Sequence, residues 1–390
     1  MNKHRIQSQE PAGESGDWPS VMSEVVPMFA ITRFFIFIVA YGGYHFIGGE
    51  LPSDNFLWHG IVPDSNAFLR IWQRWDSIHY LSILKNGYSH FTPEAMNTAF
   101  FPLYPMLGYV VNLLLRMPTF SLLLVSNVAF FFALTFLVRL VRLDHGDDVA
   151  KRTAFYVAIF PFSFFFAGMY TESLFLLTLA ATMYYARKGE WVKAGIWGIL
   201  LTSTRLVGVA GVLAAGIEYM HQRGWDFRKL DRYALAIVAM PLGLLGYMLY
   251  THLAFGDFFS LFESSQKGWN RQIAWPWVSF QEHITRIQLG TAFPIFIYNV
   301  IFSFLALALS MMNFRYLRWS YAILALALVL IPFSSNSLNA IPRYLIIVIP
   351  NFILLGILGG KKSLDLFITT GSLIFLGCLT VLYANWVYVG

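Results

Sequence analysis

Charged side chains are scarce in this 390-residue chain: Asp, Glu, Lys and Arg make up 12% of it, against 57% hydrophobic residues. A soluble domain has about a quarter of its residues charged, so too few charges are present here to cover a water-facing surface. Apolar runs such as 120–138, 322–331 and 346–357 approach or reach the roughly 20 residues that cross a bilayer. The sequence therefore predicts an all-α polytopic membrane protein.

Cysteine is nearly absent as well. Cys378 is the single cysteine and lies in an apolar segment, which excludes an intramolecular disulfide and a cysteine-based metal site. No Walker loop, GxSxG, HExxH or glycine-rich dinucleotide fingerprint stands in a valid context, which disfavours ATP-driven transport and soluble-type hydrolase chemistry. The net charge is +6 without a visible basic groove, so we expect membrane lipids as partners and no nucleic acid.

The distribution of Lys and Arg predicts the topology, because short basic loops face the cytoplasm. Basic connections lie at about 139–152, 187–193, 223–232, 315–318 and 361–362. Placing all five on one side gives about eleven spans between residues 28 and 386, among them 119–142, 153–169, 171–187 and 341–358. It also requires that 191–220 form two short helices that turn near Thr204–Arg205, and that 100–116 be a re-entrant or interfacial piece whose prolines interrupt regular helix.

The same topology predicts the domain organisation. Residues 1–24 are polar and are interpreted as a disordered cytoplasmic tail, not a cleaved signal peptide. Residues 25–390 are predicted to form one transmembrane domain. Its N-terminus lies inside, and its outer face carries two large loops at about 48–118 and 253–291.

The first outer loop contains an expected amphipathic helix. Over residues 68–80 the apolar and aromatic side chains form one stripe, and Arg74 lies on the opposite polar face, which is typical of a helix lying on the outer leaflet. Asp76 falls at the edge between the faces, with His79 three residues on. Asp76 is interpreted either as a general base or as a solvated acid, and His79 as a site residue or an interface-anchoring aromatic.

Three further charges sit at predicted outer turns. Glu172 follows Tyr170 at a helix start, where it is either a cap favoured by the helix dipole or a functional group between apolar helices. Arg205 and Arg343 either bind a phosphate, which suits the arginine geometry, or cap a helix (Arg205) and snorkel to the interface (Arg343).

The second outer loop combines aromatic, amide and cationic side chains in Gln266-Lys-Gly-Trp-Asn-Arg271. Trp269 and Arg271 suit contact with a sugar or a lipid headgroup by stacking and hydrogen bonding. An aromatic belt at the membrane interface would explain the tryptophans equally well.

Several motifs occur in a characteristic order between about Arg33 and Pro350. They are Arg74-Trp-Asp-Ser-Ile-His-Tyr-Leu81 with Asn86-Gly-Tyr88, Ala99-Phe-Phe-Pro-Leu-Tyr-Pro105, Phe160-Pro-Phe-Ser-Phe-Phe165, Tyr170-Thr-Glu-Ser-Leu-Phe175, Gly189-Glu-Trp191, Thr204-Arg205, Gly256-Asp257, Gly268-Trp269 and Pro342-Arg-Tyr344. In this ordered set the chain resembles the PIG-V family, that is, the GPI mannosyltransferase 2 type and its prokaryotic relatives.

The resemblance implies a membrane glycosyltransferase of the GT-C superfamily. Such enzymes take a sugar from a polyprenyl-phosphate carrier, such as dolichyl-phosphate mannose, invert the anomeric centre and work on the non-cytoplasmic face. By resemblance, Asp76 is the base, Glu172 orients the acceptor or the arginines, and Arg205 and Arg343 hold the phosphate. His79, Tyr170, Arg74, Tyr344, Trp269 and Arg271 complete the implied substrate-binding set. No cofactor is expected, and a divalent metal is not required because the phosphate is already a good leaving group.

We therefore expect a glycosyltransferase, most simply a mannosyltransferase, whose acceptor is a lipid-linked glycan or another outer-face molecule. It would reside in the cytoplasmic membrane of a prokaryote or the ER membrane of a eukaryote. The alternative is a transporter or flippase of a lipid-linked saccharide, which would carry ionisable residues mid-membrane on several spans, whereas Arg33 is the clear case here. A third hypothesis is that the chain is a non-catalytic partner subunit, which would tolerate alanine at Asp76.

Overall fold

The computed structural model describes residues 16–48, 60–90, 96–289 and 294–389. Over these ranges the chain forms helices joined by turns and contains no β-strand. Five stretches of the described chain are long and apolar enough to cross a membrane: α1 (Trp18–Ile47), α6 (Pro118–Ile159), α10 with α11 (Ala234–Ala239 and Leu242–Phe255), α14 (Pro294–Tyr316) and α18 (Lys362–Ala384). The predicted all-α polytopic class is confirmed, whereas the number of eleven spans stays a prediction.

Shorter helices fill the rest of the bundle. The apolar ones are α5 (Leu103–Leu115), α8 (Trp191–Thr202), α15 (Trp319–Phe333) and α17 (Ile349–Leu358). The others are α3 (Ala67–Arg70), α4 (Asp76–Asn86), α7 (Glu172–Arg187), α9 (Val209–Gln222), α12 (Ser260–Trp269), α13 (Pro276–Gln288) and α16 (Ile341–Leu345). The expected span 341–358 is thus divided into α16 and α17.

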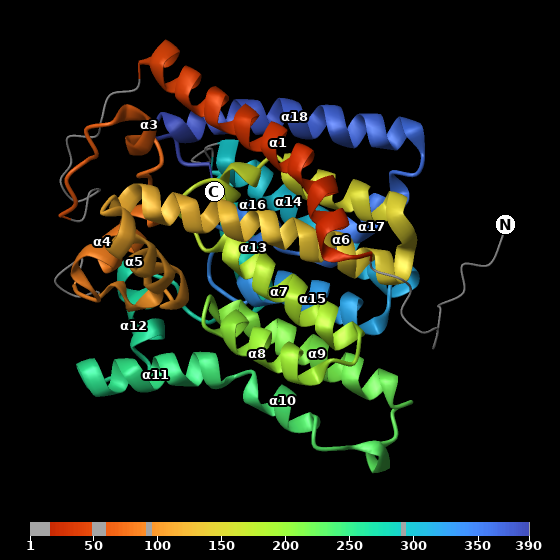
Figure 1. Cartoon of the computed structure of the whole chain (residues 1–390). Coiled ribbons are helices and arrows are strands. Elements are labelled where there is room, and N and C mark those ends of the chain that lie inside the picture. Colours follow the sequence, from red (N-terminus) through yellow and green to blue (C-terminus); the bar gives the residue numbers. More distant parts are fainter. Residues whose placement is uncertain (1–15, 49–59, 91–95, 290–293, 390) are drawn as a thin grey trace.

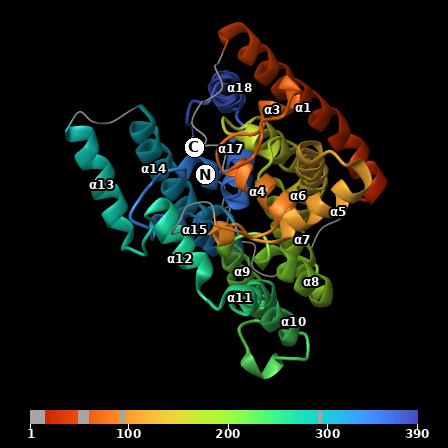
Figure 2. The same cartoon turned by 90° about the vertical axis from the view of Figure 1, so that its left-hand side faces the viewer.

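The core of the bundle lies around α6 and α7, which pack along each other. Nearly every side chain of α7 is buried, so this helix is surrounded by protein on all sides. α1 and α18 pack together along one edge (Figure 1). α4, α5 and α12 gather at the left-hand end of that view, and Figure 2 looks onto this end.

Residues 191–220 form two helices, as predicted from placing all five basic connections on one side of the membrane. α8 ends at Thr202 and α9 begins at Val209, with Arg205 in an extended conformation between them. Gly208 permits the close turn, because a Cβ there would meet the carbonyl oxygen of Leu201 at 2.8 Å. The turn carries Arg205 to the end of the bundle where α4 lies.

Two predicted boundaries in the first half of the chain are wrong. The expected spans 119–142 and 153–169 correspond to the two parts of α6, which a kink at Gly146, where φ is 77°, separates, but the second part ends at Ile159 and not at residue 169. The residue before a proline avoids helical conformation, which accounts for the end of α6 at Phe160, before Pro161. The tail is also shorter than expected, because α1 begins at Trp18 with Asp17 as its N-cap; residues 1–15 of the tail lie outside the described ranges.

The expected irregular piece at 100–116 contains a regular helix instead. α5 begins after Pro102, and Pro105 lies in its first turn, where the missing N–H leaves no hydrogen bond unmade. At 13 residues the helix is only roughly 20 Å long, which is too short to span. Met106, Val110 and Leu114 are exposed on its outer face, which suits contact with lipid.

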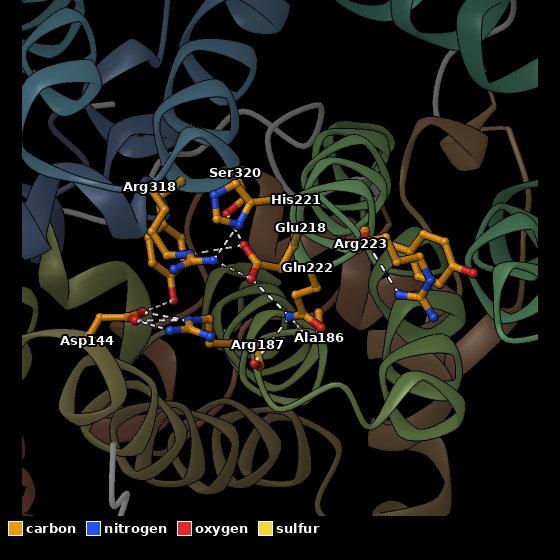
Figure 3. Close-up of polar contacts among 11 residues, drawn as sticks. Asp144, Ala186, Arg187, Glu218, His221, Gln222, Arg223, Arg318 and Ser320 are labelled. Atoms are coloured by element: carbon orange, nitrogen blue, oxygen red, sulfur yellow. Dashed lines mark hydrogen bonds and ion pairs between the residues drawn. The ribbon is translucent and has the colours of Figure 1, made fainter. Parts of the chain in front are cut away.

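The end of the bundle opposite α4 is held by buried ion pairs between helices (Figure 3). Arg187 of α7 pairs with Asp144 of α6 at 2.7 Å, and Arg318 before α15 pairs with Glu218 of α9 at 3.1 Å. Tyr321 donates to Asp144, which joins the two pairs. Arg152 donates to the carbonyl oxygen of Gly356, near the fifth basic connection. These contacts bring the basic connections together at one end.

Candidate active site

The helical conformation is interrupted at Trp75, between α3 and α4, and this interruption positions Asp76. Trp75 has φ 52°, a conformation that side chains other than glycine rarely adopt. The Ser77 hydroxyl accepts from the Arg74 N–H at 2.7 Å and donates to the Trp72 carbonyl at 2.8 Å, so side-chain bonds replace the helical ones. The prediction of one continuous helix over 68–80 with a solvated polar face is therefore wrong: Arg74 and Ser77 are fully buried.

Asp76 occupies the first turn of α4, where the helix dipole favours a negative charge. Its Oδ2 lies 2.5 Å from Nη1 of Arg343, and 29% of its side chain is exposed. Burial alone would raise the pKa of Asp76, but the Arg343 guanidinium outweighs burial and holds the pKa below its ordinary value. The carboxylate is therefore ionised at neutral pH and accessible from one side.

Glu172 forms ion pairs with two arginines, one of which also binds Asp76. Its side chain is fully buried, and Oε1 accepts from Nε of Arg343 at 2.5 Å and from Nη1 of Arg205 at 2.5 Å. Asp76, Arg343, Glu172 and Arg205 thus form a continuous ion-pair chain, which draws residues from four separate segments to one point. Removing one member of such a buried pair leaves an uncompensated charge, so the chain fixes the geometry of this region.

Arg343 and Arg205 are both held tightly. Arg343 is 4% exposed and its guanidinium lies 4.5 Å from the centre of the Tyr170 ring. It therefore does not extend outward as a snorkelling arginine would. Arg205 lies 5.2 Å from the Tyr344 ring and retains partial exposure. Each guanidinium has donors beyond those used by the carboxylates, which can bind an oxyanion.

The ion-pair chain borders a cavity of about 1100 Å³, at the end of the bundle that Figure 2 shows. Its polar end is lined by Asp76, His79, Arg205, Arg271 and Arg343, and its apolar wall by Leu206, Val207, Leu328, Ile331 and Ile347. The volume is at the upper limit of ordinary ligand sites, about 300–1000 Å³. Such a cavity suits an amphiphile with a charged head and a long apolar chain.

The second outer loop contributes a third guanidinium. Arg271 lines the cavity, donating to the Tyr344 hydroxyl at 2.7 Å and to the Asn339 carbonyl at 3.0 Å. Among the described residues it forms no ion pair. Three guanidinium groups (Arg205, Arg271 and Arg343) therefore face two carboxylates (Asp76 and Glu172), which leaves one positive charge in excess. Trp269 and Tyr344 line the same cavity.

Three of the sequence-predicted site residues do not line the cavity but support it: Glu172, which holds the two arginines, and Arg74 and Tyr170. Arg74 is fully buried and donates to the carbonyl oxygens of Arg70 and Ala384. Tyr170 is also fully buried and donates to the Arg74 carbonyl at 2.7 Å. Both hold the turn that presents Asp76.

The sequence reasoning missed Trp386 and Tyr388, which follow α18 and line the cavity. The Trp386 ring lies 4.6 Å from the Arg74 guanidinium and 5.6 Å from the Trp75 ring. Their signal in the sequence was a pair of aromatic residues directly after the last apolar run, although nothing local connects that pair to Asp76.

The chain is similar to known proteins in both sequence and fold. A family model described as Mannosyltransferase (PIG-V) matches residues 61–304. The GPI alpha-1,6-mannosyltransferase 2 of Cricetulus griseus is 31% identical over 203 residues, which cover 46% of this chain and 40% of that protein. The chain thus spans less than half the length of this curated relative.

One solved structure shows a related fold at low sequence identity. The crystal structure of ArnT from Cupriavidus metallidurans, bound to undecaprenyl phosphate, is 13% identical and superposes with a TM-score of 0.55, covering 93% of this chain and 76% of ArnT. An Archaeoglobus fulgidus oligosaccharyltransferase is 14% identical, with a TM-score of 0.46 over 93% of this chain and 53% of that protein. The likeness to ArnT concerns the fold alone.

Proposed function

The chain belongs to the PIG-V mannosyltransferase family, and from this membership and the geometry of its cavity we propose that it transfers mannose from a polyprenyl-phosphate carrier to a lipid-linked glycan or another acceptor. The family makes it an integral membrane glycosyltransferase. The observation that carries the finer proposal is the cavity itself, in which a carboxylate, excess positive charge and an apolar wall meet.

The proposed donor fits the two ends of the cavity. Its polyprenyl chain lies along the apolar wall, where each buried CH₂ contributes about 0.8 kcal/mol. Its phosphate lies among Arg205, Arg271 and Arg343, whose planar guanidinium groups bind phosphate oxygens in pairs. The structure of ArnT with undecaprenyl phosphate supports this donor class in a protein of the same fold.

The proposed reaction is a single displacement. Asp76 accepts the proton of the acceptor hydroxyl as the oxygen forms its bond to the anomeric carbon. The bond from that carbon to the phosphate oxygen breaks on the opposite face, so the configuration inverts. The electron pair leaves on the polyprenyl phosphate, whose negative charge the arginines stabilise. Glu172 is a positioning residue, because it reaches the arginines rather than the cavity.

Donor binding would also activate the base. In the free protein, Arg343 holds the pKa of Asp76 below its ordinary value. A phosphate beside Arg343 offsets that positive charge, so the pKa of Asp76 rises toward the range of a more effective base. Proton abstraction is then favoured only when the donor is in place.

The orientation follows from charge. The basic connections gather at the end opposite the cavity, and basic loops face the cytoplasm. The active site then opens on the non-cytoplasmic face, of the cytoplasmic membrane in a prokaryote or the ER membrane in a eukaryote.

The test is mannose transfer by purified protein, using radiolabelled polyprenyl-phosphate mannose with a host lipid extract as acceptor. Asp76→Asn removes the base, and Asp148→Asn, an exposed acid at the opposite end, is the matched control. We expect transfer by the wild type and the control and loss in Asp76→Asn at equal folded yield. Equal transfer by all three would remove Asp76 from catalysis. Transbilayer movement of the labelled lipid without transfer would identify a flippase instead.

A further inference from the structure

A second cavity, of about 540 Å³, lies beside the first, between α13 and the turn that precedes α16. It is lined by Trp269, Asn270, Val278, Gln281, Glu282, His283, Thr285, Arg286, Asn336, Ser337 and Asn339. Its size is in the middle of the range of small-ligand sites. Val278 is the one aliphatic side chain among these lining residues, so the cavity differs in chemistry from the apolar wall of the donor cavity.

α13 has a buried side that packs on the bundle and an exposed side that carries both apolar and polar side chains. Ser279 is buried and donates to the Phe333 carbonyl at 3.3 Å, which fastens the helix to α15. Trp277 and Ile284 are exposed on a second face, which suits the lipid interface. Gln281 and Thr285, one turn apart, are exposed on the same side of the helix and line the cavity. The helix therefore places the polar cavity beside the expected lipid interface.

The charge of this compartment is balanced. Glu282 and Arg286 pair with each other at 2.7 Å. Burial lowers the pKa of His283 and so favours the neutral ring. The cavity thus offers amide, hydroxyl and paired charged groups without excess positive charge, which suits a neutral polyhydroxyl ligand better than a phosphate.

Trp269 connects the two cavities, because it lines both. Its ring lies 5.4 Å from the His79 ring, edge to face. His79 is one turn from Asp76 on α4. Asn339 also lines the second cavity, and its carbonyl accepts from Arg271 of the first. A ligand that leaves the second cavity past Trp269 therefore arrives beside the proposed base and the phosphate-binding arginines.

We propose that this second cavity is the acceptor subsite, which binds a neutral hexose-containing glycan so that its terminal hydroxyl reaches Asp76. A hexose has an apolar C–H face that stacks on an indole and a rim of hydroxyls that both donate and accept. Gln281 supplies both functions through its amide, and Thr285 through its hydroxyl. The assignment rests on the proposed glycosyl transfer, since it gives the position of the second substrate of that reaction.

The test uses α-linked mannotriose as the probe and full-length protein in lipid nanodiscs. The double variant Gln281→Ala/Thr285→Ala removes these two polar side chains from the cavity. Among the described residues neither side chain forms a hydrogen bond with the rest of the protein, so we expect the fold to be kept. Gln288→Ala is the matched control, an exposed glutamine at the end of the same helix that is not among the residues lining the cavity. Binding is measured by saturation-transfer NMR without donor, and the KM values of acceptor and donor are measured in the transfer assay.

We expect the double variant to weaken mannotriose binding and to raise the acceptor KM, each about tenfold, from the loss of two hydrogen bonds, with the donor KM unchanged. Unchanged mannotriose binding, no binding by the wild type, or a rise confined to the donor KM would each overturn the assignment. Normal transfer with an unchanged acceptor KM in the double variant refutes the subsite and leaves the proposed function intact. Mannotriose binding that the double variant weakens, without any transfer, would keep the cavity as a glycan site but refute the proposed function and, with it, the acceptor role.

Discussion

Glu172 and Glu218 are two buried glutamates at opposite ends of the bundle, and a comparison of their glutamine variants separates geometry from stability. Glu172 bridges Arg343 and Arg205 beside the cavity. Glu218 pairs with Arg318 and accepts from Ser320 at 2.6 Å at the far end. Both side chains are almost completely buried, so Glu172→Gln and Glu218→Gln remove the same charge from similar surroundings.

The expected loss of stability is similar for the two variants. If the glutamine oxygen keeps both bonds as a neutral acceptor, the loss is about 2 kcal/mol. If the arginines are left unpaired, it rises to about 5 kcal/mol. The expected loss of transfer differs, because only Glu172 fixes the orientation of Arg343 toward the phosphate. A misplacement of about 1 Å can cost about 100-fold in rate, so we expect a loss of that order in kcat/KM for Glu172→Gln.

The assay measures thermal unfolding of each variant in nanodiscs and mannose transfer per folded molecule, well below the unfolding temperature. We expect both variants to unfold earlier than the wild type, and Glu218→Gln to keep a kcat/KM within about twofold of it. Transfer at the wild-type rate by Glu172→Gln would refute the positioning role. Parallel losses of transfer in both variants would show that activity follows stability and not the geometry of the ion-pair chain.

Three further outcomes follow from the site. The pKa of Asp76 is lowered in the free protein, so its ionised form persists as the pH falls from about 8 to about 5. The kcat/KM for the donor reports the free protein and should show no acid limb from Asp76 in that range; an acid limb near pH 6 that shifts in Asp76→Glu would contradict this. Arg271→Gln should raise the donor KM about tenfold or more, since a charge-assisted bond contributes about 1.5–3 kcal/mol, whereas Lys267→Gln, an exposed cation on α12, should leave it unchanged. Arg74→Gln should lower the unfolding temperature and leave the donor KM of the folded fraction unchanged, because the Arg74 guanidinium faces backbone carbonyls; a raised donor KM would place it in the cavity.

The sequence was informative about the fold where charge and hydropathy acted together. The division of α8 from α9 could be predicted because two basic clusters had to lie at the same end, which one long helix would prevent. The separation of the two parts of α6 near Gly146 could be predicted from the basic connection between them, whereas the end of the second part at Ile159 could not, because the apolar run continues beyond it. The prolines alone could not predict the regular course of α5. Pro105 lies in the first turn of the helix, where its missing N–H breaks no helical hydrogen bond.

The candidate site divides in the same way. The sequence and the family resemblance pointed to Asp76, Glu172, Arg205 and Arg343, and the structure brings these four together. The burial of Arg74 could not be predicted, since it depends on a bond to Ala384 across 310 residues of sequence. The helical wheel over 68–80 failed for a related reason, because the positive φ of Trp75 is imposed by tertiary packing and has no periodic signature.

The pairing of α1 with α18 has a consequence for how the protein is made. These helices lie near opposite ends of the described chain, yet they pack together, and Asn385 donates to the Gly43 carbonyl. At ordinary rates of synthesis, roughly 5–20 residues per second, α1 waits roughly tens of seconds in the membrane before α18 arrives. Trp386 and Tyr388 complete the cavity only then. A nascent chain therefore holds Arg74 without its Ala384 and Trp386 partners for that interval, and we expect no transfer before α18 is inserted.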